Sequence, residues 1–288
     1  MAVRRQASGN HTAQPASTAV SLSFRPHGGG HGHSDMLNIV LYAAGRQWLA
    51  DFGSMPYETH WKAEWTAQSV SHNTIVVDGT AQKPTGTRAT QWPGGSGSER
   101  VIGALERFDA ASKAASAHSE SAYDGIRLRR AVRLEGHCAV YAFGVSDLKG
   151  AGHQCDYVLH TDGQFERSLV SLESRSSKLG EICGYQLVEQ KQRGTSGGAF
   201  SLTFANEGKQ FRVWVPADAE TEIIVAEGLT NSPDRKMTML VLRRKATQAR
   251  FVAVFEPVDP GNEVRTVRAN KDEILIESAR GTRRVPLE

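Results

Sequence analysis

Short runs in which apolar and polar residues alternate recur along almost the whole chain, and they limit its possible folds more than any other feature. Successive side chains of a β-strand point to opposite faces, so this alternation predicts strands with one buried face. Convincing helical periodicity is almost absent. The clearest predicted strands are 21–24, 37–42, 48–51, 74–77, 127–134, 139–145, 157–160, 200–204, 211–215, 222–225, 239–243 and 251–255.

Many short strands separated by turn residues predict an all-β fold, a large two-layer antiparallel β-sandwich. The 288 residues fit one such sandwich, and 39% hydrophobic with 23% charged residues is typical of a folded globular protein. Residues 1–18 are polar and lack any period, which indicates a flexible arm or the remnant of a linker. We therefore expect one sandwich domain over residues 19–288.

The charge pattern excludes some partners. The formal net charge is +3, but basic and acidic residues are interspersed, so we expect no nucleic-acid partner, whereas an acidic ligand is compatible. Two dense basic stretches, 127–133 and 243–245, are predicted as solvated strand faces, with a groove facing a polyanion as the alternative. No apolar run is long enough to span a bilayer, so no membrane partner is expected. The three cysteines are interpreted as buried free thiols.

Histidines and carboxylates that can bind metal or transfer protons gather near the start of the chain. His31, His33 and Asp35 form one segment, Asp51 ends a predicted strand, and His72 precedes another. Two imidazoles and one carboxylate suit zinc, so His33, Asp51 and His72 are the predicted ligands, with water or another group completing the coordination. The alternative is that Asp51 and His72 satisfy loose backbone groups at strand ends. Asp35 is expected to orient a histidine.

Two known metal patterns fit poorly. The metallo-β-lactamase pattern HxHxDH begins with the same residues, but its next position is Met36 here, and the helices of that fold are missing. A cupin requires a glutamate shortly after its HxH and then a glycine-rich segment before a third histidine, and neither is present.

The ordered combination of motifs closely resembles the C-terminal β-sandwich domain of heparinase II/III-like polysaccharide lyases. Residues from about 20 to 80 carry the specific match, and the rest matches as a succession of strands. The matching segments are Gly28-Gly29-Gly30-His31-Gly32-His33-Ser34-Asp35-Met36-Leu37-Asn38, Ala44-Gly45, Ala50-Asp51-Phe52-Gly53-Ser54, Tyr57 and Ser71-His72-Asn73-Thr74-Ile75-Val76-Val77-Asp78-Gly79.

The resemblance implies a lyase that cleaves a uronic-acid-containing glycan by β-elimination in a cleft between this sandwich and an N-terminal α/α toroid. That toroid is absent from this sequence, so we expect the isolated chain to be inactive. His33, Asp51 and His72 match the family's zinc positions, which are regarded as structural, so one Zn²⁺ is expected. His31 matches the catalytic histidine, and Tyr57 lies where some members place a cleft tyrosine. The resemblance also implies a periplasmic or secreted protein.

Residues 80–100 are rich in Gly, Thr, Pro and Ser and are predicted to form a long loop of the kind that often carries function. Within it, Trp92 is a candidate for stacking on a sugar ring, and Arg88 for pairing with a uronate carboxylate. A core tryptophan and a solvated arginine are the alternatives. The competing function for the whole chain is a non-catalytic, zinc-stabilised carbohydrate-binding or structural module.

Overall fold

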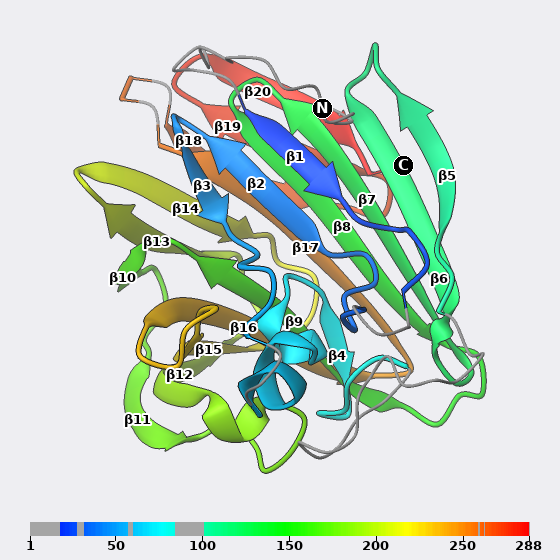
Figure 1. Cartoon of the computed structure of the whole chain (residues 1–288). Coiled ribbons are helices and arrows are strands. Elements are labelled where there is room, and N and C mark those ends of the chain that lie inside the picture. The colour runs from blue at the N-terminus through cyan, green and yellow to red at the C-terminus, as the bar shows by residue number, and fades with distance from the viewer. Residues whose placement is uncertain are drawn as a thin grey trace, which may run out of the picture.

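The computed structural model describes residues 18–27, 32–56, 60–83, 101–258, 260–261 and 263–287. Two large antiparallel sheets lie face to face in it, and Figure 1 shows β1 and β2 lying in front of β7 and β8. This arrangement confirms the predicted all-β sandwich. The predicted arm, residues 1–18, falls almost entirely outside the described residues and stays a prediction.

The first large sheet has nine strands and carries the candidate site. Its order is β1 (Ala19–Leu22), β2 (Ile39–Ala43), β3 (Arg46–Leu49), β9 (His153–Thr161), β16 (Lys236–Ala246), β15 (Thr221–Leu229), β12 (Glu189–Ser196) and β11 (Glu173–Lys178), while β4 (Ile75–Val77) also pairs with β9.

The second large sheet has eight strands and forms the opposite layer. Its order is β10 (Gln164–Ser168), β13 (Phe200–Asn206), β14 (Lys209–Val215), β17 (Gln248–Pro257), β8 (Cys138–Asp147), β7 (Ile126–Glu135), β6 (Ala114–Tyr123) and β5 (Ala104–Asp109).

Every strand predicted above overlaps a strand of the structure. The reason is that burial of one strand face requires apolar residues at alternate positions, which the sequence shows directly. β7 shows the rule: Leu128 and Val132 point into the core, whereas Arg127, Arg129 and Arg133 point outward. The outward arginines agree with the prediction of solvated strand faces. Arg130 does not, because it is fully buried on the inner side of the same strand.

The largest hydrophobic cluster lies between the two large sheets and includes Leu41 and Leu240 from one layer and Leu128 and Phe143 from the other. A third sheet of three strands, which no sequence pattern separated, packs on the outer face of the eight-stranded sheet through a second cluster. Its strands are β18 (Val264–Ala269), β19 (Glu273–Ser278) and β20 (Gly281–Pro286).

The outer face of the nine-stranded sheet is covered by irregular chain. A π-helix, Lys62–Thr66, and 3₁₀ turns at Ser69–Ser71 and Tyr185–Leu187 lie in this cover, where Trp65 and Tyr185 pack on Val158 and Ile224 of the sheet. Within the described part of the chain, no helix has the length and apolar character needed to cross a membrane. Cys138, Cys155 and Cys183 are buried free thiols, as predicted.

Candidate functional site

Asp51 and His72 meet in a gap between two strands that lie end to end. β3 pairs with β9 at Thr161, and β4 pairs with the same strand at Cys155–Tyr157, both antiparallel. β3 and β4 follow one another along a single edge of β9, because that strand is long enough to pair with both. The gap between them holds Asp51, after β3, and His72, before β4.

The side chain of Asn73 closes this gap. Its Nδ2 donates hydrogen bonds to the carbonyl oxygens of Ile39 (2.9 Å) and Ala50 (2.8 Å), and its Oδ1 accepts one from the backbone N–H of His160 (2.6 Å). The residue is completely buried. Because buried backbone groups need partners, one amide here replaces the ladder bonds that the break between the strands removes.

A second asparagine holds the carboxylate of the site. Asn38 Oδ1 accepts a hydrogen bond from the backbone N–H of Asn73 (2.9 Å), and Asn38 Nδ2 donates one to Asp51 Oδ2 (2.6 Å). The backbone N–H of Gly53 donates to the other oxygen, Asp51 Oδ1 (3.0 Å). These bonds fix the direction of the Asp51 carboxylate before any ligand arrives.

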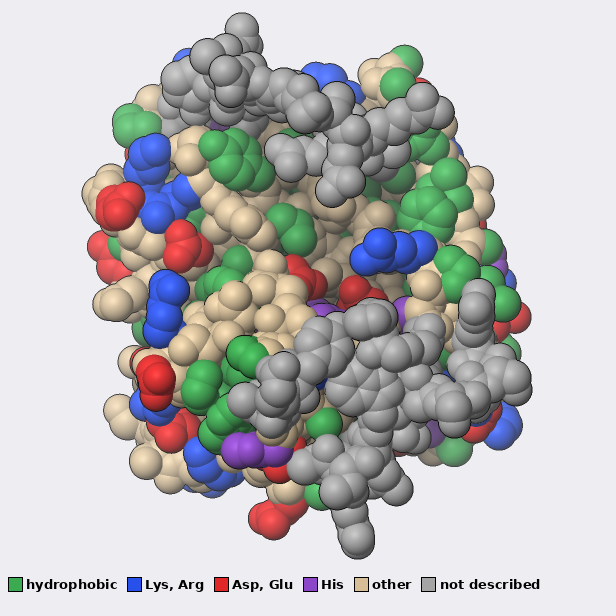
Figure 2. Space-filling model, in the orientation of Figure 1, with side chains coloured by type: hydrophobic (Ala, Val, Ile, Leu, Met, Phe, Trp, Pro, Cys, Tyr) green, Lys and Arg blue, Asp and Glu red, His purple; other side chains and the backbone are tan. Residues whose placement is uncertain are grey.

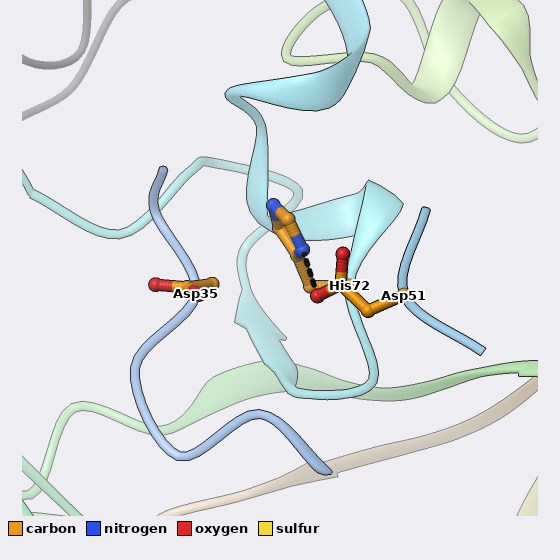
Figure 3. A group of neighbouring side chains, drawn as sticks. All are labelled: Asp35, Asp51 and His72. Atoms are coloured by element: carbon orange, nitrogen blue, oxygen red, sulfur yellow. Dashed lines mark hydrogen bonds and ion pairs between the residues drawn. The ribbon is translucent and has the colours of Figure 1, made fainter. Parts of the chain in front are cut away.

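Both ring nitrogens of His72 face oxygen atoms. Nδ1 lies 2.9 Å from Asp51 Oδ2, and Nε2 lies 3.0 Å from the carbonyl oxygen of Thr66, the last residue of the π-helix (Figure 3). Burial alone lowers the pKa of this imidazole, but the Asp51 carboxylate outweighs burial and raises the pKa of His72 to about 9. Burial opposes ionisation of Asp51 as well, yet His72 holds its pKa below the usual range.

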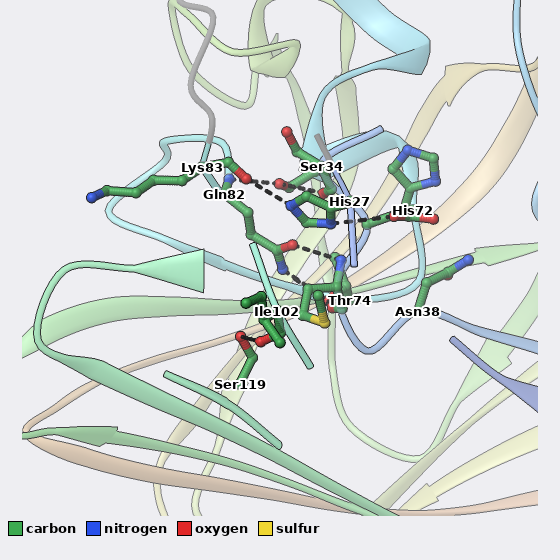
Figure 4. A network of polar contacts seen from close by, with 12 residues as sticks. His27, Ser34, Asn38, His72, Thr74, Gln82, Lys83, Ile102 and Ser119 are labelled. Carbon is green, nitrogen blue, oxygen red and sulfur yellow. Dashed lines mark hydrogen bonds and ion pairs between the residues drawn. The ribbon is translucent and has the colours of Figure 1, made fainter. Parts of the chain in front are cut away.

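Asp35 completes the group of possible ligand atoms. In the described part of the chain, Asp35, Asp51 and His72 each offer one atom within 4.8 Å of the others. Asp35 Oδ1 also lies 3.5 Å from His27 Nδ1, and His27 Nε2 lies 2.6 Å from the carbonyl oxygen of Lys83 (Figure 4). Asp35 therefore pairs with a histidine, as expected, and in addition borders the site.

His33 lies beside this group, with its ring centroid 5.2 Å from that of His72. Burial, followed by the neighbouring His72, lowers the pKa of His33 to about 4. The structure thus brings the three predicted ligands to one place, with the closest contact between Asp51 and His72. The assignment of His33, Asp51 and His72 as ligands stays a prediction.

The residues present fit a zinc-type cation. His72 is buried with oxygen acceptors at both nitrogens, so its ring needs either a second proton or a cation on the Asp51 side. Histidine ligands of zinc commonly bond their second nitrogen to a backbone carbonyl, which is the place of Thr66 here. Nitrogen and carboxylate oxygen donors of this kind suit zinc.

Four predicted functional residues lie outside the described residues. The two candidates for catalysis are His31 and Tyr57, and the two candidates for substrate binding are Arg88 and Trp92. His31 directly precedes, and Tyr57 directly follows, the described segment 32–56 that carries both His33 and Asp51. Their roles stay predictions.

Sequence reasoning missed two buried residues beneath the site. Arg130 Nη1 donates to the carbonyl oxygens of Leu37 (2.7 Å) and Asn73 (2.6 Å), and its Nη2 donates to the hydroxyl of Tyr157 (2.5 Å). His160 is 1% exposed, and burial together with His72 lowers its pKa to about 3. The alternation of β9 could have placed His160 on the outer face, and the alternation of β7 could have placed Arg130 on the inner face with Leu128 and Val132.

The surroundings of the site are polar. Gln82 links this region, because its Oε1 accepts from the backbone N–H of Met36 (2.7 Å) and its Nε2 donates to Thr74 Oγ1 (3.2 Å) (Figure 4). Figure 2 shows acidic and histidine side chains close together near the centre of this face, beside residues that are not described. The side chains of Asp35 and Asp51 are 20% and 17% exposed, so the candidate centre formed by His33, Asp35, Asp51 and His72 is accessible from the surface.

Residues 3–269 match the family Heparinase II/III-like, C-terminal, and the chain belongs to this family. The resemblance seen in the motifs is thereby confirmed over nearly the whole chain.

Two curated relatives extend the comparison. The chain is 27% identical to an exo-oligoalginate lyase of Saccharophagus degradans and 26% identical to an alginate lyase of Stenotrophomonas maltophilia, over 80% of this chain in both cases. It covers 34% and 33% of those proteins, so it spans about one third of their length.

Solved structures share the fold. A heparan sulfate lyase from Pedobacter heparinus superposes with a TM-score of 0.64 at 14% identity, covering 94% of this chain and 39% of that one. A heparinase III gives a TM-score of 0.60 at 12% identity over 93% of this chain and 38% of the other. At such low identity, these matches show the common architecture.

Proposed function

We propose that this chain is the β-sandwich part of a polysaccharide lyase that cleaves a uronic-acid-containing glycan by β-elimination. The observation that carries the proposal is the meeting of His33, Asp35, Asp51 and His72 at one break in the sheet, in a chain of this family. The relatives are named as lyases of alginate and heparan sulfate, and both polymers contain uronic acids. Because the chain spans a third of its curated relatives, we expect an α/α toroid to form the other side of the cleft.

The reaction requires two proton transfers. A base removes the proton on C5, the electron pair of that bond forms the C4–C5 double bond, and the C4–O4 bond breaks while an acid protonates O4. The substrate carboxylate on C5 must be neutralised, because negative charge develops on it as the proton leaves. A histidine and a tyrosine can perform both transfers, and His31 and Tyr57 are the candidates in this chain.

The described residues would position these groups. His33 lies two residues after His31, so holding His33 in the centre restrains the backbone that carries His31. Asn38 hydrogen-bonds the carboxylate of Asp51, and the backbone N–H of Asn73 in turn holds the side chain of Asn38. Arg88 and Trp92 are proposed to contact the substrate, the first at a carboxylate and the second at a sugar ring.

We also propose one zinc ion, held by His33, Asp51 and His72 with Asp35 at its border. When bound, the ion supplies structural cross-linking of the segments before β2, after β3 and before β4. The test is the metal content of purified protein after zinc loading and dialysis. One zinc per chain is expected for the unchanged protein, none for His72→Ala, and one for the control His118→Ala, since His118 lies in β6 beside Glu106.

Further outcomes separate the roles of the carboxylates. Asp35→Asn should retain zinc if Asp35 only pairs with His27, and should lose it if Asp35 is a ligand. Loss of zinc should lower the melting temperature by several degrees, as expected when a ligand binds only the folded state. A metal content near zero in the loaded, unchanged protein would contradict the zinc proposal.

The lyase proposal is tested in a polypeptide that joins this chain to an α/α toroid of the same family. Ultraviolet absorbance of the unsaturated uronate should rise with at least one of alginate, heparan sulfate and hyaluronan. Absence of product from all three polymers, with zinc bound, would favour the non-catalytic module. Since such polymers lie outside the cytoplasm, we expect the protein to be periplasmic or secreted.

A further inference from the structure

A hollow of about 690 Å³ lies on the outer face of the eight-stranded sheet, where the three-stranded sheet leaves part of that face uncovered. Its walls come from β7, β8 and β17, the end of β16, the segment before β15, and the turn between β18 and β19. The two basic stretches of the sequence, far apart along the chain, therefore border one hollow.

The strand register places basic side chains of β7 and β17 on both sides of a floor formed by small residues of β8. Arg129 and Arg250 both pair with Gly144 of β8, one from each neighbouring strand. Two residues further along β8, on the same outward face, Ser146 pairs with Arg127 of β7 and with Gln248 of β17. Since neighbouring strands lie about 4.8 Å apart, the backbones of the two arginines are about 10 Å apart across a glycine. The hollow is thus a groove with basic walls.

The charges of the lining are strongly unequal. Among the residues that the structure describes, six basic side chains line the groove against two acidic ones, Asp218 and Glu220. Arg244 is buried and donates to Asp218 Oδ2 (3.2 Å) and to the carbonyl oxygen of Arg250 (2.5 Å), so this wall is preorganised. Two glutamates outside the groove offset part of the charge, since Arg127 and Arg129 both contact Glu106 and Arg127 also contacts Glu120.

Two lysines keep their charge available. Lys245 and Lys271 are exposed on the groove, and neither forms an ion pair with any residue that the structure describes. An anion can therefore bind them without first displacing an internal carboxylate. The excess positive charge that remains on this face is concentrated at these two side chains.

We infer that this groove is a second binding site for an acidic oligosaccharide whose sugars carry carboxylates, separate from the candidate active centre. The basic walls suit the carboxylates, while Glu220, Ser146 and Gln248 can hydrogen-bond sugar hydroxyls. No aromatic side chain lines the groove among the described residues, so it lacks the stacking surface that single-stranded nucleic acids require. The ligand class rests on the proposed function.

The groove and the candidate centre lie on opposite sides of β7. Arg130 points inward and bonds the carbonyl oxygens of Leu37 and Asn73 beneath the centre, whereas Arg129 points outward into the groove. A glycan bound in the groove would hold the polymer on the sandwich without occupying the cleft. Such a site increases the local concentration of substrate at the enzyme.

Charge reversal at the free lysines is the first test. The probe is a saturated hexasaccharide of mannuronate, labelled at its reducing end, and its affinity is measured by fluorescence anisotropy at 0.15 M salt, where the Debye length is about 8 Å. Lys245→Glu/Lys271→Glu should weaken binding at least about tenfold, on the scale of two lost charge contacts. The matched control is Arg235→Glu/Arg280→Glu, because these exposed arginines lie at the opposite ends of β16 and of the three-stranded sheet.

A steric variant and lysine labelling locate the binding. A Cβ at Gly144 would meet only the carbonyl oxygen of Arg129, at 3.8 Å, so Gly144→Leu fills the groove floor without a clash at Cβ, and it should weaken binding as well. In the unchanged protein, the probe should protect Lys245 and Lys271 from acetylation but leave Lys178 unprotected. Equal affinity of the charge-reversed and control variants, or no protection of the two lysines, would overturn the inference.

Two comparisons identify the ligand class. Inorganic polyphosphate of equal charge should bind more weakly than the hexasaccharide, and equal or tighter binding would overturn the assignment to a glycan. Binding is measured without turnover, so this inference and the lyase proposal fail separately. Intact groove binding in a protein without elimination activity would refute only the lyase proposal, and unchanged binding of the charge-reversed variant in an active lyase would refute only the groove.

Discussion

Individual side chains, rather than regular secondary structure, build the candidate centre. Asp51 and His72 stand outside any strand, and two asparagines carry the hydrogen bonds that a continuous strand would supply. Arg130 adds a buried cation that bonds only neutral groups, two carbonyl oxygens and a hydroxyl, among the described residues. A buried guanidinium of this kind requires such acceptors, so the carbonyls of Leu37 and Asn73 are held in place.

We predict that His31 and His33 differ in their roles in a lyase that contains this chain. His31→Ala should reduce kcat by about 10²-fold or more, the usual scale for a positioned acid or base, with zinc content unchanged. His33→Ala should instead lose zinc and melt at a lower temperature. Tyr57→Phe removes only a hydroxyl, so wild-type kinetics for this variant would assign Tyr57 to packing. Full activity of His31→Ala would remove the catalytic assignment.

Asn73 provides a stability prediction that does not depend on catalysis. Asn73→Ala leaves the backbone groups of Ile39, Ala50 and His160 without their partner, so the free energy of unfolding should fall by about 3 kcal/mol. Urea denaturation measures this change. The control Asn231→Ala, at an exposed position between β15 and β16, should stay within about 0.5 kcal/mol of the unchanged protein. Equal stability of both variants would show that the gap closes without the amide.

At the scale of elements, the three-stranded sheet is attached to the sandwich by one buried carboxylate as well as by apolar contacts. Glu256 of β17 accepts hydrogen bonds from the backbone N–H of Val264 (2.6 Å) and from Trp214 Nε1 (2.8 Å), and Arg212 Nη1 lies 3.4 Å away. All three partners are donors. The site therefore accepts a carboxylate and disfavours an amide.

We predict that Glu256→Gln loosens this sheet. The NH₂ group of the new glutamine side chain must face a hydrogen-bond donor, and this should lower the free energy of unfolding by about 1–3 kcal/mol. Amide hydrogen exchange should speed up in β18–β20 before it does in β7 and β8, because the contact holds the outer layer. Glu277→Gln is the control, since the Glu277 carboxylate accepts a part-buried hydrogen bond from Thr266 within the three-stranded sheet. Uniform acceleration across all sheets would instead indicate global destabilisation.

At the scale of the whole molecule, the described residues provide one side of the proposed active centre. They hold the proposed metal ligands and their supports, and we expect the toroid to supply the group that neutralises the substrate carboxylate. The relatives are about three times longer than the matched region. An eliminative centre shared between two domains needs both to hold its reacting groups in the correct geometry.

We therefore predict that this chain, expressed by itself, gives little or no unsaturated product from alginate or heparan sulfate. Ultraviolet absorbance measures the product, and the same chain joined to a toroid is the positive control. Binding of zinc by the isolated chain should be unaffected, since all three predicted ligands belong to it. Robust turnover by the isolated chain would contradict a divided active site.

The sequence by itself determined twelve strands of the two large sheets, the fold class and the motif that led to the family. The alternation of apolar and polar residues predicted β7 correctly, because a strand with one buried face has apolar residues at every second position. The same period places Arg130 on the inner face, but a charged residue there is buried only where distant segments supply acceptors, in this case the carbonyl oxygens of Leu37 and Asn73. The cysteines, in contrast, were predicted correctly from their apolar surroundings.

Only the tertiary structure decided how the chemically active residues meet. The pairing of β3 and β4 with one edge of β9 brought Asp51 to His72, and the fold placed Asp35 and His160 beside them. It also joined two basic stretches more than a hundred residues apart into one groove. Strand partners and register are properties of the assembled sheets, because hydrogen bonds and packing between distant segments select them, and no local period in the sequence records that choice.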